Sequence, residues 1–185
     1  MIPLSKQSIS IKDINSVTRV LKSNLISRGD MILKFEKAMC NKVKCKYGIS
    51  LNSASSGLLL SYIALGIKKN DYVWSTPNSF ISTVSSCIHL GANVDFVDID
   101  PLEHNISIKE LEKKLKKTPY KKLPKVLTVV HLAGLPCDQE KISKLGRKYG
   151  FKILEDASHA LGTVNNSEPV GSCKWSDITV LSFHP

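Results

Sequence analysis

The segment Val126–Asp156 reads VLTVVHLAGLPCDQEKISKLGRKYGFKILED and contains one complete strand–helix–strand pattern. Two mostly apolar runs, Val126–Val130 and Lys152–Leu154, flank a stretch with helical spacing of apolar residues, Gln139–Tyr149. Two such strands on either side of a helix normally pair in parallel, because the helix carries the chain back across the sheet. The segment therefore predicts a βαβ unit within a mostly parallel sheet.

The same alternation continues on both sides of this unit. Short apolar runs predict four more strands, at Tyr47–Leu51, Tyr72–Ser75, Val94–Val97 and Ile178–Leu181. Helical spacing predicts three further helices among them, at Ser55–Leu65, Ser79–Leu90 and Ser107–Lys117. We therefore expect an α/β fold.

Two amphipathic helices are predicted before the first strand. The pair Ser10 and Asp13 resembles a capping box, and the helix that follows it ends near Ser23. A turn at Arg28–Asp30 begins the second helix, whose inward residues are expected to be Ile32, Phe35, Met39 and Val43. Residues 1–45 are thus expected to form N-terminal helices, and residues 46–185 the alternating strands and helices.

The composition excludes several classes of protein. No apolar run approaches the roughly 20 residues needed to span a bilayer. The N-terminus lacks a basic region followed by an apolar core, so no signal peptide and no membrane partner are expected. The five cysteines form an odd set without a CxxC pair, which is typical of reduced cytoplasmic thiols rather than of a zinc site.

The net charge of +10 raises the question of a nucleic-acid partner. Eight of the lysines lie between Lys109 and Lys125, where Ile108, Leu111 and Leu115 recur at helical spacing. This pattern is typical of an amphipathic helix with a solvated face, and no aromatic residues interleave with the lysines for base stacking. We therefore expect no nucleic-acid partner.

Loops that could carry chemistry follow the predicted strands. Right-handed crossovers place these loops along one edge of a parallel sheet, where ligands are commonly held. In NSASSG, Asn52–Gly57, free amides at a helix start and neighbouring hydroxyls suit a phosphate, although the same residues also serve as plain N-caps. This loop is neither a Walker A loop nor a GxGxxG turn.

The later loops carry acids, an aromatic residue and a hydroxyl. Asp156 could hold a ring nitrogen protonated by opposite charge, or it and Glu155 could be surface acids or caps. Phe80 could stack on a flat ligand or belong to the core. Ser182 could donate to a phosphate, and no GxSxG elbow supports a hydrolase. The stretch lacks a full ligand set for a metal.

The order of these motifs carries more information than any one of them. The stretches NSASSGLLLSYIALGI, STPNSFISTVSSCIHLGANVDFVDIDP, ILEDASHALG and VGSCKWSDITVLSFHP resemble the DegT/DnrJ/StrS family of sugar-nucleotide aminotransferases. The resemblance covers nearly the whole chain, including an N-terminal lead-in made of IPLSKQSIS and LKSNLISRGDMILKFEKAMC. HLAGLPCD, GSCKWSD and SFHP are most similar to the transaminases of pseudaminic acid synthesis.

The resemblance implies a fold, a cofactor and a reaction. The fold would be the three-layer large domain of a fold type I enzyme that uses pyridoxal 5′-phosphate (PLP). The reaction would transfer an amino group, with glutamate as the expected donor, to a 4-keto-6-deoxy sugar nucleotide in surface-polysaccharide or nonulosonic acid biosynthesis. Members of this family are typically homodimers.

Three residues are implied to hold the cofactor phosphate. Ala54 and Ser55 would present backbone amides and a hydroxyl, with Ser182 on the other side of the phosphate. The family motif has Gly and Thr where this chain has Ala54 and Ser55. If the backbone at residue 54 needs a positive φ, the alanine would cost on the order of 1 kcal/mol.

Three more residues are implied to surround the pyridine ring. Phe80 would stack on the ring, Asp156 would pair with its nitrogen, and His159 would lie near its 3-hydroxyl group. The lysine that forms the Schiff base would lie two residues beyond Pro185, so no catalytic residue is expected among residues 1–185. The rest of the large domain and the small C-terminal domain are also expected beyond this point.

Without that lysine, we expect this chain alone to be inactive as a transaminase. One alternative is a non-enzymatic fragment of a split or truncated gene, which a downstream chain could complement. Another is a PLP-dependent sugar 3-dehydratase, because some relatives carry histidine in place of the lysine.

Overall fold

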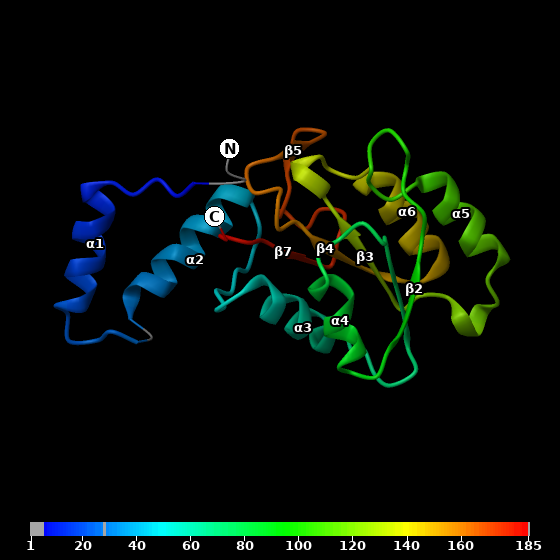
Figure 1. The fold of residues 1–185 in the computed structure, drawn as a ribbon, viewed down its shortest axis with the longest axis horizontal. Coiled ribbons are helices and arrows are strands. Elements are labelled where there is room, and N and C mark those ends of the chain that lie inside the picture. Colours follow the sequence, from blue (N-terminus) through cyan, green and yellow to red (C-terminus); the bar gives the residue numbers. More distant parts are fainter. Residues whose placement is uncertain (1–5, 28, 185) are drawn as a thin grey trace.

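A computed structural model describes residues 6–27 and 29–184. Residues 1–5, Arg28 of the predicted turn and Pro185 of the SFHP motif lie outside this described part. Five strands form one parallel sheet in the order β2-β1-β3-β4-β7 (Figure 1). Their bounds are Tyr72–Ser75 for β1, Asn93–Phe96 for β2, Val126–Val130 for β3, Lys152–Asp156 for β4 and Ile178–Val180 for β7.

Helices cover both faces of the sheet and make three layers (Figure 1). Helices α3 (Ala54–Ala64) and α4 (Ser82–Ile88) pack on one face, and α5 (Ile108–Lys117) and α6 (Gln139–Tyr149) pack on the other. A short hairpin of β5 (Val164–Asn165) and β6 (Glu168–Pro169) forms in the loop after β4, at the turn expected there. Single turns of 3-10 helix occur at Tyr120–Lys122 and Leu132–Gly134.

Strand β3 shows why the sheet needs both helical layers. All five of its residues are buried, so its sequence, VLTVV, is almost continuously apolar rather than alternating. Val126 packs with the α3 and α4 layer, whereas Leu127 and Val129 pack with the α5 and α6 layer. The same alternation along β4 directs neighbouring side chains to opposite faces of the sheet.

Several boundaries differ from those predicted. Strand β4 extends two residues further, to Asp156, because Glu155 and Asp156 pair in register with Val129 and Val130. Helix α4 begins three residues later than predicted, at Ser82. A turn in which the Ser79 amide donates to the Pro77 carbonyl (3.2 Å) occupies the residues expected to open that helix.

The predicted strand at Tyr47–Leu51 was wrong: no residue of this segment is in a strand. The edge strands β2 and β7 each pair on one side only, and within the described residues this segment pairs with neither. The Glu36 carboxylate instead accepts hydrogen bonds from the amide and the hydroxyl of Ser50, at 2.8 and 2.9 Å. Ile49 is left 82% exposed.

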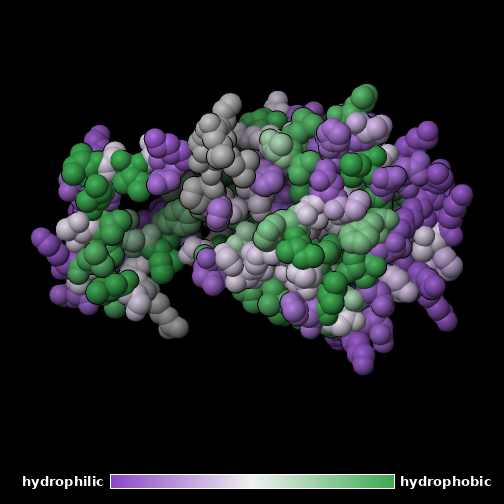
Figure 2. Space-filling view, in the orientation of Figure 1, coloured by the Kyte–Doolittle hydropathy of each residue, from purple (hydrophilic) through white to green (hydrophobic). Residues whose placement is uncertain are grey.

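The N-terminal helices form as predicted but bury little. The capping box at Ser10 and Asp13 opens α1 (Ile11–Leu21), and α1 has no buried residue. Helix α2 (Asp30–Val43) buries only its last residue; Ile32 and Phe35, expected to face inward, are exposed. Figure 2 shows apolar side chains gathered at this end of the molecule. None of the helices in the described residues is long and apolar enough to cross a bilayer.

Candidate functional site

The predicted site residues follow the carboxyl ends of the parallel strands. Strand β2 lies on one side of β1, and β3, β4 and β7 lie on the other, so the strand order reverses between β1 and β3. Such a reversal opens a crevice at the carboxyl edge of a parallel sheet, where ligands are held in folds of this kind. The loops after β1, β4 and β7 all reach this edge.

The start of α3 offers unpaired donors to an anion. The Ser53 hydroxyl caps the helix by accepting from the Ser56 amide at 3.1 Å. Ala54 and Ser55 are the first two helical residues, and no group in the described part of the chain accepts their amide hydrogens. The hydroxyls of Ser55 and Ser82 lie 2.7 Å apart. One of them donates to the other, so the second keeps its proton for another acceptor.

The departure of this loop from the family motif causes no strain. Ala54 has regular helical geometry and is not among the residues with positive φ. The helix also approaches the sheet closely at Gly57, where an added Cβ would lie 3.1 Å from Val180 Cγ1. Val180 pairs in register with Asp156. Gly57 of α3 therefore lies against β7, the strand that pairs with the strand of Asp156.

Asp156 is 4% exposed and is therefore neither a surface acid nor a helix cap. Its Oδ2 accepts from the Thr83 hydroxyl at 2.7 Å. Its Oδ1 accepts from the Ser158 hydroxyl at 2.6 Å and from the Ser158 amide at 3.3 Å. A carboxylate has about four acceptor positions, so one position, on Oδ2, remains for a further donor.

The other three predicted residues lie on loops at the same edge. Phe80 is 69% exposed, which excludes the core role that the sequence left open. The His159 Nδ1 accepts from the Ala133 amide at 3.3 Å, and the Ser182 hydroxyl accepts from the His184 amide at 3.2 Å. Within residues 6–27 and 29–184, no hydrogen bond links His159 or Ser182 to Asp156.

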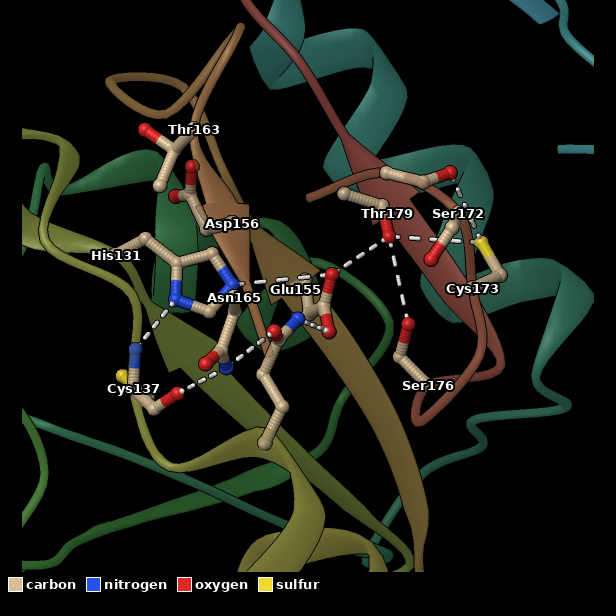
Figure 3. A network of polar contacts seen from close by, with 12 residues as sticks. His131, Cys137, Glu155, Asp156, Thr163, Asn165, Ser172, Cys173, Ser176 and Thr179 are labelled. Carbon is tan, nitrogen blue, oxygen red and sulfur yellow. Dashed lines mark hydrogen bonds and ion pairs between the residues drawn. The ribbon is translucent and has the colours of Figure 1, made fainter. Parts of the chain in front are cut away.

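Glu155 forms a separate buried network on the opposite face of the sheet (Figure 3). Its carboxylate accepts from the Gln139 side-chain amide and from the Thr179 hydroxyl, the latter at 2.8 Å. His131 Nε2 lies 3.7 Å from Oε2, too far for a hydrogen bond but close enough for an electrostatic contact. Burial raises the pKa of Glu155, but these neighbours outweigh it and hold that pKa below its usual value.

The proton on His131 is fixed by its second nitrogen. Nδ1 accepts from the Cys137 amide at 3.1 Å, so in the neutral ring the proton lies on Nε2, facing Glu155. Asn165 then joins the hairpin to the network by donating to the Gln139 side chain at 2.8 Å. His131 directly follows β3 and is fully buried within this network.

Comparison with known proteins assigns the chain to a family. A sequence model of the DegT/DnrJ/EryC1/StrS aminotransferase family matches residues 7–185. The chain belongs to this family. The match confirms the resemblance found in the loop motifs.

Individual members of the aminotransferase family agree with this assignment. The chain is 38% identical over all 185 residues to the UDP-4-amino-4,6-dideoxy-N-acetyl-beta-L-altrosamine transaminase of Campylobacter jejuni, and covers 48% of that protein. Among solved structures, PseC of Helicobacter pylori, an aminotransferase involved in the biosynthesis of pseudoaminic acid, matches with a TM-score of 0.90. That match has 29% identity and covers 98% of this chain and 47% of PseC.

A third relative, NtdA from Bacillus subtilis, was solved with bound cofactor PMP, pyridoxamine 5′-phosphate. It matches with a TM-score of 0.81 and 28% identity, over 96% of this chain and 39% of NtdA. These neighbours confirm the predicted fold class, an α/β sheet of the aminotransferase type. The chain spans about half the length of the curated relatives it matches.

Four residues that the structure places around the site do not stand out in the sequence of this family member: Tyr62, Ser82, Thr83 and Ser158. Ser82 and Thr83 lie two and three residues after Phe80, in the first turn of α4. The hydroxyl-rich run STPNSFIST, which ends at Thr83, was a signal that could have drawn attention to them. Nothing local in the sequence marks Tyr62, because its partners come from other elements of the fold.

Proposed function

We propose that this chain is the N-terminal part of the PLP-binding domain of a sugar-nucleotide aminotransferase. The complete enzyme would transfer an amino group from glutamate to a 4-keto-6-deoxy sugar nucleotide, for pseudaminic acid or a related surface sugar. The observation that carries this proposal is the 38% identity, over the entire chain, to the Campylobacter jejuni transaminase of a UDP-linked amino sugar.

The arrangement of the site fits PLP. The free amides of Ala54 and Ser55 would receive the phosphate at the positive end of the α3 dipole. The exposed ring of Phe80 would cover one face of the pyridine. The Asp156 carboxylate would keep the ring nitrogen protonated by opposite charge. When bound, PLP supplies an electron-withdrawing ring that stabilises negative charge on the substrate.

The remaining assignments extend this proposal. His159 would lie near the 3-hydroxyl group of the cofactor, and Ser182 would donate to its phosphate. The family lysine that holds PLP covalently would lie beyond Pro185. We propose a cytoplasmic homodimer for the complete enzyme, or for this chain together with a downstream chain that supplies the lysine.

A chimera tests the proposal most directly. Residues 1–185 would replace the matched half of the Campylobacter jejuni transaminase, and the protein would be supplied with ¹⁵N-glutamate and a UDP-linked 4-keto-6-deoxy sugar. We expect ¹⁵N in the sugar product from the chimera and none from the 185-residue chain alone. An Asp156→Asn chimera is the matched control and should lose most of the activity.

Two results would count against the proposal. One is a folded chimera that binds PLP but transfers no amino group to the keto sugar. The other is turnover by the 185-residue chain alone, which would show that the reaction does not depend on the expected lysine. A chain that folds and binds neither PLP nor PMP would favour the alternative of a non-enzymatic fragment.

A further inference from the structure

A chain of buried hydroxyl groups leads to Asp156 from the interior of the α3 and α4 layer. Thr83 is fully buried on α4, and its hydroxyl lies 2.7 Å from Asp156 Oδ2. Tyr62, fully buried on α3, lies 2.6 Å from the Thr83 carbonyl oxygen and 2.7 Å from the Thr128 hydroxyl of β3. These hydrogen bonds therefore connect two helices and a central strand to the Asp156 carboxylate.

The donor and the acceptor can be assigned for each of these hydrogen bonds. A carbonyl oxygen can only accept, so the Tyr62 hydroxyl donates to the Thr83 carbonyl. Tyr62 has a single proton, so the Thr128 hydroxyl must donate to the Tyr62 oxygen. Burial raises the pKa of Tyr62, which keeps this phenol protonated. The Asp156 carboxylate can only accept, so Thr83 donates to it.

Because only one arrangement of protons is possible, these hydrogen bonds hold the side chains in fixed orientations. Ser75 strengthens it by donating to the Thr128 carbonyl at 2.9 Å. The two oxygens of Asp156 nevertheless differ in their surroundings. Ser158 donates twice to Oδ1, whereas Thr83 alone donates to Oδ2. The open acceptor position is therefore on the oxygen that Thr83 holds.

We propose that Thr83 is the positioning residue for Asp156, and that Oδ2 is the oxygen presented to the ring nitrogen of a pyridine cofactor. The Thr83 hydroxyl would fix the rotation of the carboxylate, and the Tyr62 contact would fix the backbone of Thr83. This inference rests on the proposed function, because it needs a protonated ring nitrogen as the fourth donor to Asp156.

Binding of two ring analogues to the 185-residue chain separates this role from a general loss of structure. The probes are pyridoxamine 5′-phosphate and its 1-deaza analogue, in which a C–H group replaces the ring nitrogen. Neither probe needs a Schiff base. Thr83→Val removes the hydroxyl at nearly constant volume, Thr83→Ser keeps it, and Ser158→Ala is the matched control on the other oxygen.

We expect Thr83→Val to weaken binding of pyridoxamine 5′-phosphate about tenfold, the scale of one charge-assisted hydrogen bond. Binding of the deaza analogue should be unchanged, and Thr83→Ser should bind both probes within about twofold of the wild type. Ser158→Ala should weaken pyridoxamine 5′-phosphate less than Thr83→Val does. Tyr62→Phe, which keeps the Thr83 hydroxyl, provides a second test if the valine variant loses its helical circular dichroism.

The inference is overturned if Thr83→Val binds pyridoxamine 5′-phosphate like the wild type, or if it loses both probes equally. If Thr83→Val does not fold, the other variants decide. The inference is then overturned if Tyr62→Phe binds pyridoxamine 5′-phosphate like the wild type and Thr83→Ser loses as much affinity for it as Ser158→Ala. A folded wild-type chain that binds neither probe would instead overturn the proposed function, and the role of Thr83 with it.

Discussion

Glu155 and Asp156 are consecutive buried acids at the end of one strand, yet they serve different surroundings. Glu155 faces the α5 and α6 layer and accepts from α6 and β7, with the His131 ring beside it. Asp156 faces the α3 and α4 layer, and one of its acceptor positions is still open. Burial alone therefore does not distinguish the two acids, whereas the open acceptor position at the edge of the sheet does.

Substitutions of the two acids should therefore affect different properties of the protein. Glu155 joins α6 and β7 directly, and the β5–β6 hairpin through Gln139, by hydrogen bonds. Removing it should cost stability. Asp156 accepts from Thr83 and Ser158 and keeps one open acceptor position, so removing its charge should cost cofactor affinity.

The largest effect is expected from Glu155→Ala. The substitution leaves the Gln139 and Thr179 donors without this acceptor and removes the charge beside the buried His131 ring, which should lower the free energy of unfolding by about 3–5 kcal/mol. Urea denaturation followed by circular dichroism measures this change. Glu140→Ala, which removes an exposed ion pair with Lys144, is the matched control and should leave the same quantity nearly unchanged.

A loss below about 1 kcal/mol in Glu155→Ala would contradict this view of the network. It would mean that water enters and replaces the carboxylate, so that the two acids differ less than their contacts indicate.

Asp156→Asn should produce the complementary result. The amide keeps an oxygen for Thr83 but loses the charge that attracts a protonated ring, so the affinity for pyridoxamine 5′-phosphate should fall about 100-fold. Fluorescence titration measures the affinity. Glu155→Gln, which removes the charge on the opposite face, should bind the same probe within about threefold of the wild type. Equal losses in the two variants would remove the distinction between the two faces.

Acid should weaken the Glu155 network in a defined direction. Burial raises the pKa of Glu155, but the His131, Thr179 and Gln139 side chains outweigh it and leave that pKa below the ordinary value of 4.5. Because the pKa is lower in the folded state, the stabilisation is complete above the pKa of the unfolded chain and is lost as the pH falls through the folded value.

The unfolding free energy of the wild type should therefore fall more between pH 7 and pH 3 than that of Glu155→Gln. Urea melts at a series of pH values give this comparison. Other carboxyl groups with lowered pKa, such as Asp71 and Asp138, contribute equally to both proteins and cancel in the difference. Parallel curves for the two proteins would show that the pKa of Glu155 is the same in the folded and unfolded states, which would contradict this prediction.

The smallest effect is expected from Ser158→Ala. Asp156 Oδ1 would lose the hydroxyl donor but keep the Ser158 amide, so stability should fall by about 0.5–1.5 kcal/mol. Thermal denaturation measures this change, with Ser16→Ala on the exposed face of α1 as a control. A loss of stability as large as that of Glu155→Ala would show that the hydrogen bonds around Asp156 are as important to the fold as those around Glu155.

Much of the fold was predictable because it depends on local patterns. The apolar run at β3 and the helical spacing at α6 have the bounds expected from the sequence, and the capping box at Ser10 forms as predicted. The segment Tyr47–Leu51 failed because a strand also needs a neighbour to pair with, which no local pattern supplies. The apolar face of α1 was recognised, but its exposure depends on what packs against it.

The sequence predicted which loops carry the candidate site residues, but it did not predict the contacts that these residues make. Asp156 and Phe80 could be selected because each follows a predicted strand, and the resemblance to a family gave them roles. The partnership of Thr83 with Asp156 spans 73 residues and arises only when α4 packs beneath β4. The opposite orientations of Glu155 and Asp156 required β4 to extend two residues beyond its predicted end.

The strand order also has a consequence for how the chain is made. Every strand of the sheet pairs with one that precedes it in the sequence, so the sheet can grow as the chain leaves the ribosome. At a synthesis rate of about 5–20 residues per second, the 73 residues between Thr83 and Asp156 take roughly 4–15 seconds to appear. Until β4 has been synthesised, Thr83 therefore lacks the carboxylate to which it donates in the folded chain.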